Sequence, residues 1–155
     1  AIQPMYVKTT VSEVIHSKRL IYPIESDFSP GLLAMADAGR VETILNHLVQ
    51  NAIDATEDGS PIRVSASRQD DWVAIRVTDK GSGMTEAFVA NQLFKPFEST
   101  KSGGFGIGAY EARALAQSLG GHLHVDSRLG KGTRMTLLLS AAKEPAHDKD
   151  IDKAA

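Results

Sequence analysis

The feature that most constrains the fold of this chain is one long amphipathic helix in its first half. Its apolar residues recur at the spacing i, i+3, i+4 and i+7, which places them on one face of an α-helix. They are Val41, Ile44, Leu45, Leu48, Val49, Ala52 and Ile53. Asp37 is a suitable N-cap before the segment, and the turn residues 58–61 stop it. The sequence therefore predicts its strongest helix here, with one face in a core.

Composition favours a single soluble globular domain. The chain has 155 residues, of which 42% are hydrophobic and 23% are charged, enough for a core that folds alone. Its 17 basic and 19 acidic residues give a net charge of −2, so no broad positive field attracts nucleic acid or anionic membranes. The chain has no cysteine, which excludes disulfides and thiolate chemistry. We expect no nucleic-acid partner and no direct membrane contact from these residues.

The remaining segments alternate between strand and helix patterns. Residues 62–69 and 72–79 are rich in β-branched residues and flank the turn Asp70-Asp71, which predicts an antiparallel hairpin. Further strand-like segments are expected at 7–10, 21–28, 122–126 and 134–142, and a short apolar run lies at 32–36. Helices are expected at 11–18, 85–90 and 108–119, the last of them ended by Gly120-Gly121. The domain is expected to span 1–142, followed by a disordered tail at 143–155.

Polar residues line one border of the apolar face of the long helix. His47, Asn51 and Asp54 lie within about 60° of one another when each residue is rotated by roughly 100°. For each of them, an ordinary solvated helix flank is the commoner explanation. The strand that ends in Asp79 is followed by Gly81 and Gly83, where a carboxylate could accept a hydrogen bond from a ligand or could simply cap a turn. Neither feature alone establishes a site.

A glycine-rich segment precedes the last predicted helix. Gly104, Gly106 and Gly108 could present backbone amides to a phosphate at the start of that helix, where the helix dipole also favours an anion. The pattern does not fit a dinucleotide-binding fold, because no strand directly precedes it, and no Gly-Lys-Ser/Thr follows to make a Walker loop. Residues 99–106 offer little volume to a core, which predicts a mobile loop.

Five motifs occur in a fixed order between about residues 37 and 139. They are His47-x-x-x-Asn51-Ala52, Asp79-x-Gly81-x-Gly83, Phe94-Lys95-Pro96-Phe97, Gly104-x-Gly106-x-Gly108 and Gly130-x-Gly132-Thr133. Together they resemble the boxes of the ATP-binding domains of sensor histidine kinases, which share a fold with gyrase, Hsp90 and MutL. The resemblance implies an α/β two-layer sandwich with a mixed, mostly antiparallel sheet and three main helices on one face, known as the Bergerat fold. The nucleotide would lie between sheet-edge loops and the long helix.

The resemblance also implies roles for individual residues. Asn51 would hold a Mg²⁺ ion that bridges the phosphates, and Asp79 would accept a hydrogen bond from the adenine amino group. Phe94 and Phe97 would form the hinge of an ATP lid, and Lys101 would lie near the terminal phosphate as a catalytic group. Further nucleotide contacts would come from Gly81, Gly83, Asp54, Gly104, Phe105, Gly106, Ile107, Gly108 and Thr133.

Two positions depart from the family pattern. His47 stands where many relatives have asparagine, and Asp54 stands where many kinases have a basic residue. The ATPase branch of the superfamily has a glutamate base at the position of His47. An imidazole there could orient a water as a catalytic group, but a contact with phosphate or with a water on Mg²⁺ is the favoured interpretation.

The expected function is that of a protein-histidine kinase catalytic domain that binds Mg-ATP. It would donate the γ-phosphate to a histidine on a dimerisation hairpin outside this chain, ahead of a response regulator, in the cytoplasmic part of a membrane-bound sensor. The segment 103–139 is also similar to kinases associated with the exosortase (PEP-CTERM) exopolysaccharide system. The alternatives are an ATP-gated interaction module and an ATPase related to gyrase or MutL, which the absence of a glutamate before Asn51 disfavours.

Overall fold

The computed structural model describes residues 1–96 and 108–143, which form two layers. One layer is a five-stranded sheet with the strand order β2-β4-β5-β7-β6. The strands are β2 (Ile24–Phe28), β4 (Ile62–Gln69), β5 (Trp72–Asp79), β7 (Gly132–Ser140) and β6 (His122–Arg128). Only β2 and β4 pair in parallel, and the other three pairings are antiparallel. The mixed, mostly antiparallel sheet predicted from the sequence is confirmed.

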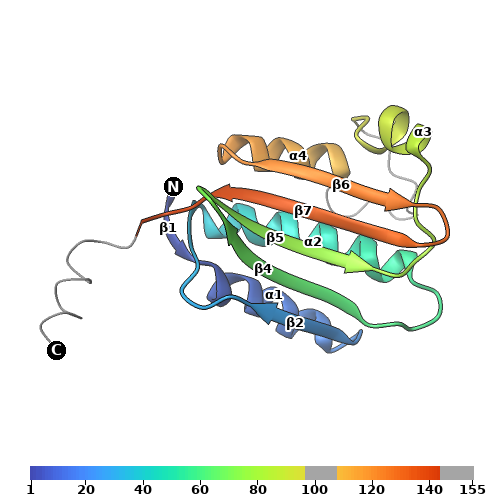
Figure 1. Cartoon of the computed structure of the whole chain (residues 1–155), viewed down its shortest axis with the longest axis horizontal. Coiled ribbons are helices and arrows are strands. Elements are labelled where there is room, and N and C mark those ends of the chain that lie inside the picture. The colour runs from blue at the N-terminus through green and yellow to red at the C-terminus, as the bar shows by residue number, and fades with distance from the viewer. Residues whose placement is uncertain (97–107, 144–155) are drawn as a thin grey trace, which may run out of the picture.

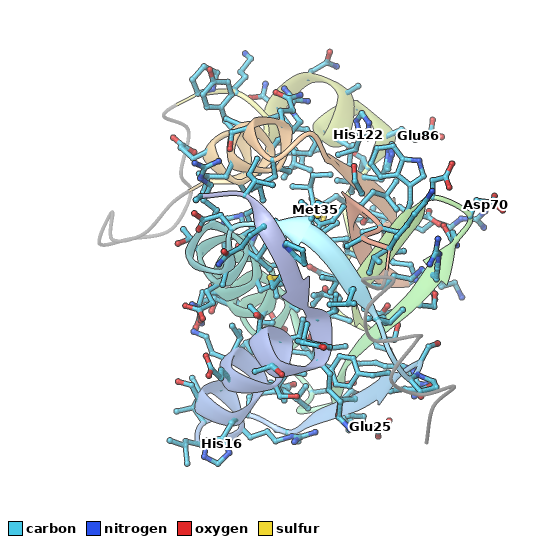
Figure 2. The ribbon with its side chains drawn as sticks, turned by 90° about the vertical axis from the view of Figure 1, so that its left-hand side faces the viewer. His16, Glu25, Met35, Asp70, Glu86 and His122 are labelled. Atoms are coloured by element: carbon cyan, nitrogen blue, oxygen red, sulfur yellow. The ribbon has the colours of Figure 1, made fainter. Side chains whose placement is uncertain are left out.

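The second layer consists of three helices on one face of this sheet. They are α1 (Val7–Arg19), α2 (Ala38–Ala55) and α4 (Ala109–Ser118). Figure 1 looks onto the sheet with the helices behind it, and the view in Figure 2 is turned so that His16 on α1 lies on the helix side and Asp70 on the sheet side. The two-layer α/β sandwich with three main helices on one face is therefore confirmed.

Helix α2 forms where its apolar period predicts it. The Asp37 side chain accepts from the backbone N–H of Arg40 at 3.1 Å, so the predicted N-cap is present. Six residues of its apolar face are buried, namely Val41, Ile44, Leu45, Leu48, Val49 and Ala52. They pack against strands of the sheet in one continuous core, which places the polar border of α2 along the edge of that core.

The N-terminal segment corrects one prediction. Residues 7–10 were expected to be extended, but they form the first turns of α1, and a short strand β1 (Gln3–Tyr6) precedes them. Val7, Thr10, Val11, Val14 and Ile15 are all buried and follow the helical period. Burial of that face outweighs the strand propensity of the β-branched residues. Strand β1 pairs with β3 (Leu33–Ala36) in a separate two-stranded sheet.

Other element boundaries differ from the predictions by a few residues. The hairpin of β4 and β5 matches its predicted bounds, and Asp70 adopts a positive φ of 55° in its turn. Strand β7 begins two residues earlier than expected because the sheet continues through Gly132 and Thr133. The helix expected at 85–90 is α3 (Glu86–Phe88), followed by a π-helical turn at Val89–Leu93. Within the described parts of the chain, no helix is long and apolar enough to cross a bilayer.

Candidate nucleotide-binding site

The candidate residues of α2, β5 and β7 gather at one end of the sandwich. Strand β5 ends at Asp79 beside the last turns of α2, and helix α4 begins at the same end, on the right in Figure 1. The loop after β5 is fixed on two sides. On one side the backbone N–H of Ser82 donates to the carbonyl of Ala55 at the end of α2, at 3.1 Å. On the other side Gly130 N–H donates to the carbonyl of Ser82 at 2.6 Å, in the turn between β6 and β7.

Asp79 is a buried carboxylate at the end of a core strand. Its side chain is on the core-facing side of β5, and the residue is 7% exposed. Its Oδ1 accepts from the backbone N–H of Gly81 at 2.8 Å. Burial raises the pKa of Asp79, while the backbone amides of Gly81 and Thr133 oppose that rise. A carboxylate that is poorly solvated and has few hydrogen-bond donors around it is suited to accept a hydrogen bond from a ligand.

The turn-capping explanation for Asp79 is therefore correct but incomplete. The Oδ1 contact with Gly81 is the ordinary turn hydrogen bond of an Asp-x-Gly sequence. Capping a turn does not require a carboxylate to be buried. Asp79 is buried, and its charged form therefore bears a desolvation cost. The structure thus gives this residue a local role and a position suited to a further one.

Thr133 lies directly opposite Asp79 in the pairing of β5 with β7 and is also buried. Its hydroxyl contacts the Ser127 hydroxyl at 2.7 Å, and the backbone N–H of Met84 donates to Ser127 Oγ at 2.8 Å. Ser127 therefore connects β6, β7 and the loop after β5 beside the pair of Asp79 and Thr133, where the resemblance places the adenine base. The sequence analysis did not single out Ser127, because its contact with Met84 joins residues that are distant in the sequence.

Two residues of the polar border of α2 are in direct contact. Asn51 Nδ2 lies 2.9 Å from His47 Nε2, and both side chains are half-buried. With the amide nitrogen as donor, the imidazole nitrogen accepts, and Oδ1 is the atom of Asn51 that carries lone pairs for a cation. One turn further on, Gln50 Nε2 donates to Asp54 Oδ1 at 2.9 Å. The predicted stripe therefore consists of a contacting pair, His47 and Asn51, with Asp54 exposed on the next turn and bonded to Gln50.

The residues around Phe94 join two motifs that are separate in the sequence. The Arg113 guanidinium on α4 lies over the Phe94 ring, 4.2 Å from its centroid. Phe94 is half-buried and packs against the main core, so it anchors the start of the segment for which the resemblance implies a lid hinge. Such a cation–π contact contributes roughly 0.5–2 kcal/mol. At the start of α4, Gly108 N–H donates to Glu111 Oε2 at 3.0 Å, so a carboxylate already meets an amide of the predicted phosphate site.

The described residues do not include the whole predicted site. The positions Phe97, Lys101, Gly104, Phe105, Gly106 and Ile107, together with the predicted mobile loop, lie outside them, as does the tail from residue 144. Among the described residues, His47 contacts Asn51, and Asp79 contacts Gly81 and pairs with Thr133. Asp54 lies on the next turn of α2, and Gly83 lies in the loop after β5 that is bonded to the end of α2. Phe94 and Gly108 are linked through α4.

A close approach of two backbone segments explains the glycine at position 83, for which the resemblance implied a nucleotide contact. Gly83 has a φ of +69°, and a Cβ built there would meet the carbonyl oxygen of Arg128 at 1.9 Å. At Gly81, a Cβ would meet the carbonyl oxygen of Ala55 at 2.3 Å. Both glycines are therefore required by the packing of the loop itself, whatever else they contact.

Replacing Gly83 by alanine should consequently destabilise the protein strongly. The variant adds a steric clash, costing about 1–3 kcal/mol, to the strain of a left-handed residue. Gly130→Ala is the matched control, because Gly130 has a φ of +78° and no atom within 4 Å of its built Cβ. We expect the control to lose only about 1–2 kcal/mol in urea unfolding. Equal losses in the two variants would contradict the close approach.

Comparison with known proteins identifies the family. Residues 36–143 match the model of the family described as histidine kinase-, DNA gyrase B-, and HSP90-like ATPases. The chain belongs to this family. Its relatives include a bacteriophytochrome of Pseudomonas aeruginosa, 33% identical over 131 residues, which covers 79% of this chain and 18% of the relative. The C4-dicarboxylate transport sensor protein DctS of Rhodobacter capsulatus is 36% identical over 121 residues, covering 76% of this chain and 18% of DctS.

Solved structures agree with this family assignment at the level of the fold. The mycobacterial sensor histidine kinase MprB superposes with a TM-score of 0.79 at 18% identity, covering 93% of this chain and all of that one. The catalytic domain of histidine kinase ThkA gives a TM-score of 0.76 at 24% identity, covering 90% of this chain and 95% of the other. The chain spans less than a fifth of the two relatives named above, so it corresponds to one domain of much longer proteins.

Proposed function

We propose that this chain binds Mg-ATP and supplies the γ-phosphate for phosphorylation of a histidine on a dimerisation hairpin that these residues do not contain. The observation that carries the proposal is the buried Asp79 carboxylate, which lies opposite Thr133 and begins the loop that is bonded to the end of α2. Family membership adds support, because ATP is the common substrate of these domains.

In the proposed complex, adenine lies against the end of β5. The amino group of adenine donates to Asp79, and Thr133 borders the base on the strand side. The network of Ser127, Thr133 and Met84 holds the pocket walls in place, so little ordering is required when the base enters. The phosphates then extend along α2 towards the start of α4.

The residues at the α2 border fit a magnesium ion. Mg²⁺ takes one or two protein oxygens and fills its other positions with phosphate oxygens and water. Asn51 offers a neutral carbonyl oxygen whose carboxamide is oriented by His47, and the carboxylate of Asp54 lies one turn away. When bound, the ion would neutralise part of the phosphate charge. His47 would act by positioning Asn51, which agrees better with its observed contact than a role as a general base.

The downstream partner and the cellular place follow from the same proposal. Among the relatives, several are named as sensor proteins or sensor kinases. We infer that the whole protein passes its phosphoryl group to a response regulator and that this domain works in the cytoplasm.

The phosphotransfer proposal is tested with γ-labelled ATP. We expect no acid-labile label on this chain alone, because none of the four histidines in the described residues combines an exposed helix with an adjacent acid. His147 precedes Asp148 but lies outside the described residues, in a segment with few apolar residues to hold a helix against a partner. His16, on α1, is followed by serine, and His122 and His124 lie on a strand. Adding a separately made dimerisation-hairpin fragment from the same gene should produce label on that fragment. Stable acid-labile label on this chain alone would overturn the assignment of roles.

A further inference from the structure

Two exposed histidines stand side by side on the open face of the sheet. His122 and His124 are on β6, which is the edge strand, and the strand period directs them away from the core residue Leu123 between them. The helices pack on the opposite face, and Figure 2 shows His122 on the sheet side. His122 pairs with Leu138, five positions along β7 from Thr133, or roughly 17 Å from the candidate base pocket.

The two imidazole rings are spaced for a shared ligand. Their centroids are 6.1 Å apart and their planes differ by 27°. A metal ion with one nitrogen from each ring at about 2.0–2.1 Å would hold the centroids roughly 4.5–6 Å apart, depending on the angle between the ligands. Because both side chains are exposed, small rotations about their side-chain bonds can close the difference.

The donor set selects a class of metal. Imidazole nitrogen suits Zn²⁺, Ni²⁺ and Cu²⁺, whereas Mg²⁺ and Ca²⁺ prefer oxygen ligands. The described residues contain no group of three or more metal-binding side chains, so water would fill the other coordination positions.

The charges around the pair also permit a cation. Asp126 follows on the same face of β6 and is exposed. Its neighbour across the strand pair is Arg134, whose Nε donates to Thr78 on β5 at 3.3 Å, on the side away from β6. The guanidinium is therefore drawn away from the histidine strand.

We propose that His122 and His124 together bind one divalent transition-metal ion, on the face of the sheet opposite the helices and apart from the nucleotide site. Affinity should follow the order Cu²⁺ above Ni²⁺ and Zn²⁺ for such nitrogen ligands. The two rings act as a chelate, because a metal ion bound by one imidazole meets the other imidazole at a high effective concentration. This proposal does not depend on the proposed ATP binding.

The chain carries its own reporter for this site. Trp72 is its only tryptophan, and its ring lies 5.3 Å from that of His122. Cu²⁺ bound by the pair should quench the tryptophan fluorescence at short range, and Zn²⁺ should compete with it and restore the signal. Mg²⁺ at the same concentration should do neither.

The test titrates the chain with CuCl₂ in a non-coordinating buffer and follows Trp72 fluorescence. His122→Gln and His124→Gln should each weaken the quenching titration at least about tenfold, because a single imidazole loses the chelate. His16→Gln, at an exposed histidine on α1, is the matched control and should titrate like the parent chain. Circular dichroism and ATP affinity should be unchanged in all three variants. Quenching of equal strength in the His124→Gln variant, or none in the parent chain, would overturn the proposal.

Discussion

Replacing Asp79 by asparagine is expected to remove most of the ATP affinity of this domain without weakening its fold. Asparagine keeps an oxygen that can accept from Gly81 N–H, so the turn contact of 2.8 Å survives. Its other polar atom becomes an N–H donor, which would face the amino group of adenine. Loss of a buried hydrogen bond together with two opposed donors costs about 1–3 kcal/mol, so affinity should fall roughly tenfold or more by calorimetry.

The same substitution carries a pH signature in the ligand-free protein. Burial raises the pKa of Asp79, so the folded chain holds this proton more tightly than the unfolded chain does. The parent chain should therefore lose stability relative to the Asp79→Asn variant as pH rises from about 3.9, the unfolded value, through the raised folded pKa. At neutral pH the variant should be at least as stable. An asparagine variant that binds ATP like the parent chain, or that unfolds more easily at pH 7, contradicts this account.

The second large effect concerns Asn51. Asn51→Ala should lower the affinity for Mg-ATP roughly tenfold or more, because contacts to charged groups contribute about 1.5–3 kcal/mol. The effect should depend on Mg²⁺, whereas the affinity for adenosine should change little. Asn46→Ala is the matched control, since Asn46 is an exposed asparagine on the same helix outside the polar stripe.

Calorimetry with and without Mg²⁺ measures both variants, and circular dichroism checks their fold. Asn51→Ala also removes the partner of His47, so the size of the Mg²⁺-dependent loss separates metal binding from a general disturbance of the helix. A folded Asn51→Ala protein with unchanged Mg²⁺-dependent affinity would exclude Asn51 as the metal ligand.

The parts of the fold that could be predicted are those with a clear local period. Helix α2 has both an apolar face and a capping aspartate, and the hairpin of β4 and β5 has a turn between two β-branched runs. The start of α1 was predicted wrongly because Val7 and Thr10 are β-branched, and strand propensity depends on what covers the residue. Strand β1 was not predicted, since its pairing with β3 joins segments about thirty residues apart.

The candidate site likewise contains residues that could be predicted from the sequence and residues that could not. Asn51 and Asp79 were predicted through motif order and resemblance, and the burial of Asp79 supports the proposal that it accepts a hydrogen bond from a ligand. Ser127 and Arg113 were missed, because each matters through a contact with a residue distant in the sequence. Glu111 was missed although it stands three residues after Gly108, which is the spacing of a capping box. Gly83 was assigned to the ligand, whereas the structure first requires it for packing against Arg128.

The central claim is that adenine is recognised by the buried carboxylate at the end of β5, and paired calorimetric titrations with Mg-ATP and Mg-GTP test it most directly. Guanine carries a carbonyl oxygen where adenine carries its amino group. With GTP bound, this oxygen and the Asp79 carboxylate would face each other, and both are hydrogen-bond acceptors. We predict that the parent chain binds ATP at least about tenfold more tightly than GTP. Equal affinity for the two nucleotides, or no binding of ATP, would contradict the account.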